Sequence, residues 1–253
     1  MQSSQVQFSI AAHAAWAPGL ATHAAWVDWA RSPFVIQGTE QAPLDAMPAM
    51  LRRRAGFLGK MALQVAYSCL GDRQDIPAVF CSRHGDVARA LELLKNVVQQ
   101  EPMSPTSFAL SVHNANAGLF SIARQANSNQ CALAAGQGTI EHAVIEACGL
   151  LADGAKQVLL VTYDTNLPAV YSPYLDCAEQ PHAWAWLIEA PSGNATQDVM
   201  QLSWSAAGPV EGSDSTDTDA MPASLAVWQF YLNQEPHYER VAERRRWRWI
   251  RHA

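Results

Sequence analysis

The segment CALAAGQGTIEHA, residues 131–143, contains a thiol and an imidazole at a spacing that could support acyl transfer. An apolar run ends at Gly136 and a helical pattern follows it, which is the strand-turn-helix geometry that exposes a nucleophile in many enzymes. Cys131 is the nearby thiol, and a helix N-terminus together with a base within reach would activate it. His113 and His142 are candidate bases. One hypothesis is therefore an autonomous thioester acyltransferase or hydrolase that uses Cys131.

The same residues also have structural interpretations. Cys131 lies inside the predicted apolar strand, where a thiol usually behaves as a small buried hydrophobe. His113 and Asn114, in SVHNANAG, could line a reactive cleft, but they could equally satisfy backbone groups of a packed helix. His142 falls in the middle of a predicted helix. We favour the structural role for all three polar side chains, because no strong nucleophile in the sequence needs them.

Metal and cofactor sites are not expected. The five cysteines show neither a C-x-x-C pair nor a Cys/His cluster at zinc-ligand spacing. Gly136 and Gly138 form only a loose G-x-G, and neither G-x-G-x-x-G nor G-x-x-x-x-G-K-[ST] occurs. We interpret these glycines as backbone positions at a sharp turn.

The charge and hydropathy patterns exclude several classes of protein. A net charge of −6 over 253 residues argues against a nucleic-acid-binding body. No apolar stretch is long enough to cross a bilayer, and the first residues lack a secretory signal pattern, so we expect a soluble, cytoplasmic protein without membrane contact. The tail ERRRWRWIRHA is basic. It could reach an acidic carrier protein or the membrane surface, or it could form an edge strand in which arginines alternate with Trp247, Trp249 and Ile250.

The periodicity of apolar residues predicts a single α/β domain over residues 1–253. The expected helices cover 51–70, 85–100, 104–125, 138–154 and 223–234. The expected strands begin at residue 5 and cover 77–82, 130–136, 156–164, 183–190 and 200–208, the last of them pairing with its predecessor. The expected loops cover 31–50, 165–180 and 209–222, the last being acidic at 211–219 and flexible. Two consecutive strand-helix units imply a parallel or mixed sheet that is covered on both faces.

The run SPTSFALSVHNANAGLFSIARQ followed by CALAAGQGTIEHAVIEACGLLADGAKQVLLVTYD, residues 104–164, resembles the N-terminal half of a β-ketoacyl synthase. Within that superfamily it is most similar to the short chain length factors of bacterial aryl polyene gene clusters, which share SVHNANAGLFSIA and VLLVTYD. The resemblance extends over residues 30–190. It implies a thiolase-like, layered α-β-α-β-α fold, truncated relative to full ketosynthases.

The sequence departs from the catalytic members at the decisive position. Matching Gly136, Ile140, His142 and Ala143 to the family pattern G-x-x-x-I-x-H-A puts Leu133 where a condensing ketosynthase has its cysteine. A leucine cannot hold an acyl group as a thioester. The H-G-T and N-A-H motifs of the family's two catalytic histidines are also absent. No catalytic residue is therefore expected, apart from the fallback pair Cys131 and His113.

The resemblance implies a non-elongating chain length factor. Such a subunit pairs with a catalytic ketosynthase as a heterodimer, through the strand beside the nucleophile turn, and helps to shape the acyl tunnel in which a polyene or fatty-acid-like chain grows. An acyl carrier protein is a further possible partner. The residues expected at the pocket or interface are His113, Asn114, Leu133, Ala134 and Gly136.

Overall fold

The computed structural model describes residues 4–193, 198–208 and 218–252. The elements of its first half are β1 (Ser4–Trp16), α1 (His23–Arg31), α2 (Ala49–Arg52), α3 (Phe57–Leu70), β2 (Ala78–Cys81), α4 (Val87–Val98), α5 (Pro105–Ala109) and α6 (Ala115–Arg124). Those of its second half are β3 (Gln130–Leu133), the 3-10 helix η1 (Gly136–Gly138), α7 (Thr139–Ala152), β4 (Gln157–Asp164), the 3-10 helix η2 (Ala169–Tyr174), β5 (His182–Glu189), β6 (Val199–Ala206), α8 (Ala223–Leu232), β7 (His237–Ala242) and β8 (Arg245–His252).

The described strands form one hydrogen-bonded sheet in the order β3-β2-β4-β5-β1-β6-β8-β7. Strands β2, β3 and β4 are parallel, and the remaining pairs are antiparallel. The two predicted strand-helix units therefore supply the parallel part of the sheet, because parallel neighbouring strands need a crossover connection. The sheet is mixed, which is one of the two arrangements that the sequence pattern predicted.

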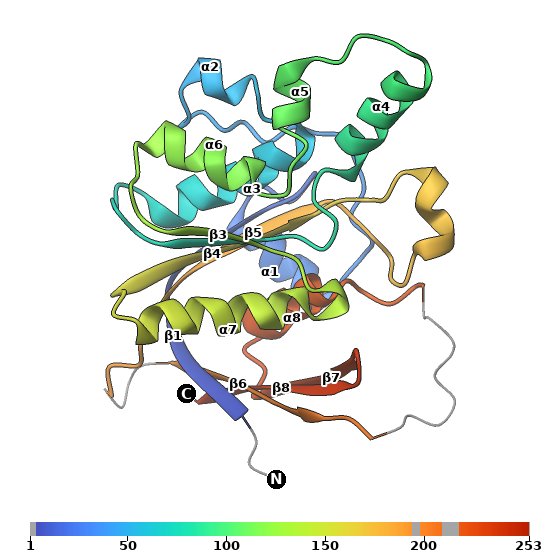
Figure 1. Cartoon of the computed structure of the whole chain (residues 1–253). Coiled ribbons are helices and arrows are strands. Elements are labelled where there is room, and N and C mark those ends of the chain that lie inside the picture. Colours follow the sequence, from blue (N-terminus) through green and yellow to red (C-terminus); the bar gives the residue numbers. More distant parts are fainter. Residues whose placement is uncertain (1–3, 194–197, 209–217, 253) are drawn as a thin grey trace.

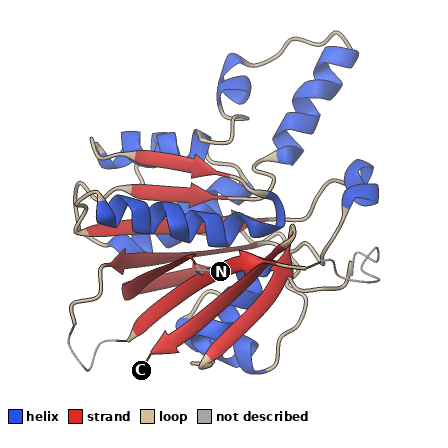
Figure 2. Ribbon diagram, turned by 60° about the horizontal axis from the view of Figure 1, so that its bottom comes forward, coloured by secondary structure: helices blue, strands red, loops and turns tan. Residues whose placement is uncertain are grey.

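Strand β1 folds this sheet into two parts. Its residues from Ser9 to Trp16 pair with β5, and its residues from Ser4 to Ser9 pair with β6, with an irregularity between Ile10 and Ala12. A bulge of this kind bends a strand and increases its twist. We call β3-β2-β4-β5 with the second half of β1 the upper sheet, and the first half of β1 with β6-β8-β7 the lower sheet. Figures 1 and 2 show the two parts as separate layers of strands.

The helices form one layer above the upper sheet and another between the two sheets (Figure 1). Residues of α3 and α6 share a buried cluster with one face of the upper sheet, including Phe80 of β2 and Leu159 of β4. Residues of α1, α7 and α8 share a second cluster with the opposite face, including Leu160, and with Trp249 of β8. Neighbouring strand residues thus face different cores, as period-two geometry dictates. The result is four layers in the order α-β-α-β.

The outward face of the lower sheet is polar. Gln7 of β1 donates a hydrogen bond to Gln201 of β6 at 3.0 Å, and Glu239 of β7 accepts one from Arg248 of β8 at 3.0 Å. No described helix packs on this face (Figure 1). The described residues thus form four layers, whereas the resemblance implied five for full ketosynthases.

Two of the predicted helices are interrupted. The helix expected over 51–70 is split into α2 and α3, because Gly56 takes an extended conformation as the N-cap of α3. The helix expected over 104–125 is split into α5 and α6 by a turn at 110–114. Helix α1 was not expected at all, although Thr22 caps it in the usual way by accepting a hydrogen bond from the amide of Ala25.

Two predictions about strands were also wrong. The strand at 200–208 was expected to pair with the strand at 183–190, whereas β1 lies between β5 and β6. The C-terminal strand β8 is not an edge strand, because β7 covers its free side. Its alternation holds at Trp247 and Trp249, which are buried, but the side chain of Arg251 is also largely buried and pairs with Asp198. The loop predicted at 209–222 lies mostly outside the described residues.

Candidate functional site

The candidate site is the turn between β3 and α7, residues 134–138. Gly136 has a φ of +52°, a conformation that glycine adopts without steric penalty. The Thr139 hydroxyl accepts a hydrogen bond from the amide of Ala135 at 3.0 Å and donates one to the carbonyl of Gly136 at 2.8 Å. The predicted strand-turn-helix geometry is therefore present, and the side chain of Thr139, in the first turn of α7, stabilises the turn by these two hydrogen bonds.

Leu133 and Cys131 lie on the same face of β3. Both are half-buried and pack against the core between the two sheets. Burial raises the pKa of the Cys131 thiol, and the nearby Glu146 carboxylate raises it further. A nucleophilic cysteine needs the opposite shift. The environment of Cys131 therefore suits a small packing residue, while Leu133 stands at the end of the strand, where the chain enters the turn.

The backbone of Ser82, directly after β2, is hydrogen-bonded to both Leu133 and His113. The amide of Ser82 donates a hydrogen bond to the carbonyl of Leu133 at 3.2 Å, and the carbonyl of Ser82 accepts one from Nε2 of His113 at 3.0 Å. Gly85, with a φ of +64°, allows the imidazole to approach, because a Cβ there would lie 3.1 Å from its Cδ2. His113 thus satisfies a backbone carbonyl, and Asn114 is the N-cap residue of α6 without a side-chain capping bond.

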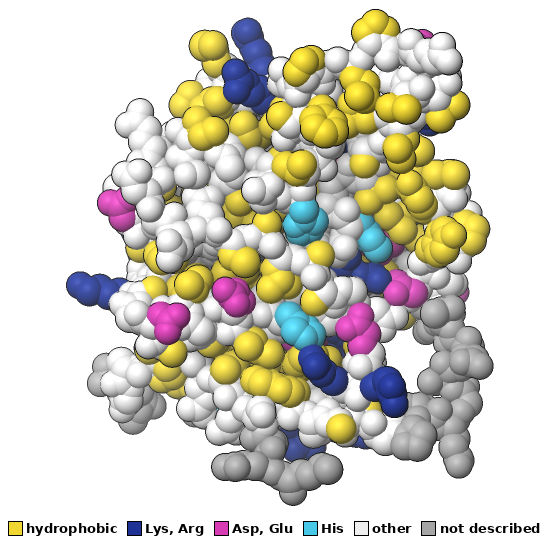
Figure 3. Space-filling model, viewed as in Figure 1, with side chains coloured by type: hydrophobic (Ala, Val, Ile, Leu, Met, Phe, Trp, Pro, Cys, Tyr) yellow, Lys and Arg dark blue, Asp and Glu magenta, His cyan; other side chains and the backbone are white. Residues whose placement is uncertain are grey.

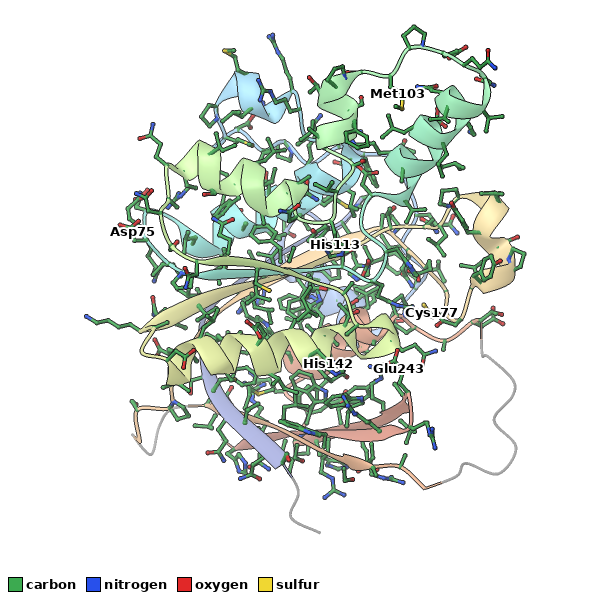
Figure 4. All side chains as sticks on the ribbon, in the orientation of Figure 1. Asp75, Met103, His113, His142, Cys177 and Glu243 are labelled. Carbon is green, nitrogen blue, oxygen red and sulfur yellow. The ribbon has the colours of Figure 1, made fainter. Side chains whose placement is uncertain are left out.

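The hairpin formed by β7 and β8 encloses the turn from the other side. Oε1 of Glu243 accepts a hydrogen bond from the amide of Gln137 at 3.1 Å. Arg240 donates to the carbonyl of Gln137 at 3.0 Å and to both carboxylate oxygens of Glu141 at 2.9 and 3.0 Å. Figure 4 shows Glu243 and His142 together at the N-terminal end of α7. The basic C-terminal segment therefore contacts the candidate turn, a role the sequence did not indicate.

His142 also connects α7 to this hairpin. Its Nδ1 lies 2.8 Å from the carbonyl of Gly138, so Nδ1 carries the proton and donates it. Its Nε2 then accepts from the guanidinium of Arg245 at 2.7 Å. Both ring nitrogens are engaged within the chain, in agreement with the structural role predicted for His142.

A buried ionic cluster lies beside the turn, and sequence reasoning missed most of it. Oδ1 of Asp164, at the end of β4, accepts hydrogen bonds from the Ser82 hydroxyl at 2.8 Å and from the amide of Arg83 at 2.9 Å. Burial, reinforced by the Glu179 carboxylate, raises the pKa of Asp164 to about 7. The sequence offered one signal, a polar SRH run directly after an apolar strand.

The guanidinium of Arg83 is the centre of this cluster. It donates to both oxygens of Asp176 at 2.8 Å, to Glu179 at 3.1 Å and to the sulfur of Cys177 at 3.0 Å. These three acceptors have metal-ligating atoms within 4.8 Å of one another. The arginine already supplies the positive charge that a metal ion would bring. Asp176 also accepts from the side chain of Gln137 at 2.9 Å, which joins the cluster to the candidate turn.

Two exposed features surround the site. Strand β3 pairs only with β2 among the described strands, so its outer edge is free of any partner strand within the described chain.

Large hydrophobic side chains are exposed on α4, on α5 and the segments next to it, and on η2, and Figure 3 shows them gathered on one face. We call this surface the apolar ridge; its members are Leu94, Val97, Val98, Met103, Phe108, Val112, Val170 and Tyr174. Such a concentration is typical of an interaction surface.

No helix in the described part of the chain combines the length and the apolar character that crossing a bilayer requires.

The basic segment at 240–251 contains six of the chain's 17 Lys and Arg residues. Most of these arginines are paired with Glu141, Glu239 or Asp198.

Comparisons with known proteins agree with this geometry. The model of the family described as "Beta-ketoacyl synthase, N-terminal domain" matches residues 26–250. No curated protein sequence matches the chain. Among solved structures, a ketosynthase in complex with its chain length factor from Xenorhabdus doucetiae is similar with a TM-score of 0.80 and 26% identity, over 97% of this chain and 99% of that one.

Two further structures are similar in fold alone. The ishigamide ketosynthase/chain length factor has a TM-score of 0.61 and 14% identity, over 79% of this chain and 68% of that one. A beta-ketoacyl synthase from Burkholderia phymatum STM815 has a TM-score of 0.61 and 12% identity, over 90% and 70%. The thiolase-like α/β fold implied by the sequence resemblance is therefore confirmed.

Proposed function

The chain belongs to the β-ketoacyl synthase family, and on that premise we propose that it is a non-elongating chain length factor, which pairs with a catalytic ketosynthase and shapes its acyl tunnel. One observation carries the proposal. The strand-turn-helix of a ketosynthase is intact, yet Leu133 stands at the position that the family pattern assigns to the nucleophile. A leucine side chain has no group that can attack a thioester.

Three further observations support the proposal. The neighbouring thiol, Cys131, has a raised pKa and packs as a core residue. The turn is bound by Glu243 from within the chain instead of standing open. The Xenorhabdus structure that the chain matches over nearly its whole length is described as a ketosynthase in complex with its chain length factor. A subunit that keeps the fold without the nucleophile can still form part of its partner's pocket.

The free edge of β3 and the apolar ridge are the surfaces we assign to the partner. A strand edge presents unpaired backbone groups, and a second sheet can add to it. Val98 and Phe108 of the ridge are 83% and 60% exposed. Burying such side chains against a partner contributes about 25 cal/mol per Å² of apolar surface.

Co-expression with a catalytic ketosynthase from the same genome tests the pairing. We expect the two proteins to elute as one complex at micromolar concentration, with a mass equal to the sum of the two subunits by light scattering. Val98→Asp and Phe108→Asp should weaken the complex about tenfold or more, equivalent to about 1.4 kcal/mol each. Val241→Asp, at an exposed residue of β7, is the matched control. Separate elution of the two wild-type proteins would refute the proposal.

Product length tests the pocket-wall role of Leu133. In the reconstituted complex, Leu133→Phe should shorten the products and Leu133→Ala should lengthen them, because the side chain would limit the space available to the growing acyl chain. Leu151→Phe, at another half-buried leucine that packs against the same core, controls for general damage. An unchanged product distribution in both Leu133 variants would remove this residue from the pocket.

Mass spectrometry discriminates the autonomous enzyme that would use Cys131. We expect no covalent adduct after incubation of the isolated chain with an acyl-thioester. A stoichiometric adduct that Cys131→Ala abolishes would establish acyl transfer by this chain itself and overturn the non-catalytic assignment.

A further inference from the structure

Glu243 lies unusually close to the backbone of the candidate turn. Its Oε1 is 3.1 Å from the amide nitrogen of Gln137. A Cβ built on Gly136 would lie 2.0 Å from the same oxygen, a distance that real Cβ atoms do not tolerate. The carboxylate therefore occupies the space directly over Gly136, and only glycine at that position permits it.

The carboxylate satisfies a donor that the turn leaves available. The amide of Ala135 donates to the Thr139 hydroxyl, and the amide of Gly138 donates to the carbonyl of Ala135. The amide of Gln137, one turn before the body of α7, instead donates to Glu243. Backbone N–H groups at the start of a helix attract anions, because the helix dipole leaves partial positive charge there.

Glu243 lies at the tip of the hairpin, where the backbone conformation is unfavourable for a residue other than glycine. Ala242 pairs with Arg245, so Glu243 and Arg244 form a two-residue loop, and both have positive φ, +51° and +65°. Such loops favour Asn-Gly or Gly-Gly, and non-glycine residues with positive φ cost of order 1 kcal/mol or more each. A glutamate held there against this preference points to a role for its side chain.

Other residues of the hairpin hold the tip in place. Arg240 donates to the carbonyl of Gln137 and pairs with Glu141, whose side chain is fully buried. Arg245 donates to His142 on the next turn of α7. The hairpin therefore binds both backbone groups of Gln137, its N–H through Glu243 and its carbonyl through Arg240.

We propose that the β7-β8 hairpin is an internal latch on the vestigial nucleophile turn, in which the Glu243 carboxylate takes the anion position of the Gln137 amide and closes the turn to an anionic ligand group. The latch is independent of whether the chain pairs with a ketosynthase. If the latch proposal failed, the co-expression test of ketosynthase pairing would be unaffected, because neither Glu243 nor Gly136 belongs to the apolar ridge or to β3.

Amide hydrogen exchange in the full chain tests the latch. Glu243→Gly removes the carboxylate while relieving the positive φ, so weaker protection cannot be attributed to strain in the loop. We expect exchange of the Gln137 amide to rise about fivefold or more. Glu243→Gln, which keeps an acceptor oxygen but loses the charge, should give a smaller rise. Asp153→Ala removes an exposed carboxylate from the opposite end of α7 and should leave Gln137 unchanged.

Formate provides a second measurement. At a few tens of millimolar, it should restore protection of Gln137 in Glu243→Gly and leave the wild type unaffected, whereas chloride at the same ionic strength should not. Unchanged exchange at Gln137 in Glu243→Gly would overturn the proposal. A rise spread evenly over the whole chain would also overturn it, since that is loss of global stability and not opening of one contact.

A double-mutant comparison probes the steric part of the argument. Gly136→Ala should lower the melting temperature of the wild type by more than it lowers that of Glu243→Gly, because the added Cβ then meets no carboxylate. Equal shifts in the two backgrounds would show that Glu243 does not occupy the space over Gly136, and would refute the latch.

Discussion

The upper and lower sheets differ in how many of their faces are covered by described helices. Neighbouring residues of β4, Leu159 and Leu160, are both fully buried, because helices cover both faces of the upper sheet. In β8 of the lower sheet, the buried Trp247 and Trp249 flank the exposed Arg248. A continuous apolar run therefore marks a strand inside the layered body, and an alternating one marks a strand at its surface. The alternation of β8 shows where the stack of layers ends.

The largest expected loss of stability comes from a charge on the helix-covered outer face of the upper sheet, compared with a charge on the outward face of the lower sheet. Leu159→Glu places a carboxylate in the core between the upper sheet and α3, and should lower the free energy of unfolding by about 4 kcal/mol or more. Gln201→Glu, on the outward face of the lower sheet, should change it by less than about 1 kcal/mol. Urea denaturation measures both. Similar losses would mean that the lower sheet is covered as well.

The next effect concerns the attachment of the lower sheet to the middle helices. Arg240→Ala leaves the fully buried Glu141 carboxylate without its partner, and should cost about 3–5 kcal/mol. Replacing the pair together, as Arg240→Met with Glu141→Leu, should recover most of that loss, because no buried charge remains. A double variant as unstable as Arg240→Ala would show that packing of the arginine, and not the orphaned charge, is what matters.

A smaller effect comes from the ionic cluster at the end of the upper sheet. Because burial raises the pKa of Asp164 to about 7, the native state keeps a proton that the unfolded chain loses near pH 4. Its contribution to stability is therefore complete below about pH 4 and is lost as the pH rises through about 7. Asp164→Asn should flatten the fall in stability over this range.

The measured quantity is the difference between the wild type and Asp164→Asn in thermal unfolding at several pH values. His182 acts in the opposite sense, since burial lowers its pKa to about 4 and its contribution is lost as the pH falls. It is common to both proteins and cancels in the difference. Parallel pH profiles for the two proteins would contradict the raised pKa of Asp164.

The smallest effect is expected on the outward face of the lower sheet. Arg248→Ala removes an exposed ion pair with Glu239, and should change the urea midpoint far less than Arg240→Ala does, with a still smaller effect in high salt. A loss comparable with that of Arg240→Ala would show that this face is buried in the protein as it exists in solution.

The upper sheet was largely predictable from the sequence, and the lower sheet was not. Strands β2, β3 and β4 are compact apolar runs, each followed or preceded by a periodic helix, so local patterns suffice to place them. The position of β1 between β5 and β6 depends on partners that lie about 170 to 200 residues away in the sequence, as in the pairing of Ser4 with Trp204. Local periodicity carries no information about such pairings.

The same limit applies to the candidate site. The turn and Leu133 could be located because their residues are adjacent in the sequence. Glu243 and Gln137 are 106 positions apart, and Arg83 and Asp176 are 93 apart, so their contacts emerge only from the fold. The helix breaks at Gly56 and at 110–114 were missed because each flanking segment retains helical periodicity, while tertiary contacts decide where the helix stops.

The place of β1 has a consequence for the order of events during synthesis. This strand is synthesised before both of its neighbours, β5 and β6, which are made only after residue 181. Until then neither of its edges has the strand that it pairs with in the folded chain, and the core around Phe8 is incomplete. We therefore expect folding to be slow and the nascent chain to depend on chaperones more than one whose first strand pairs with the second.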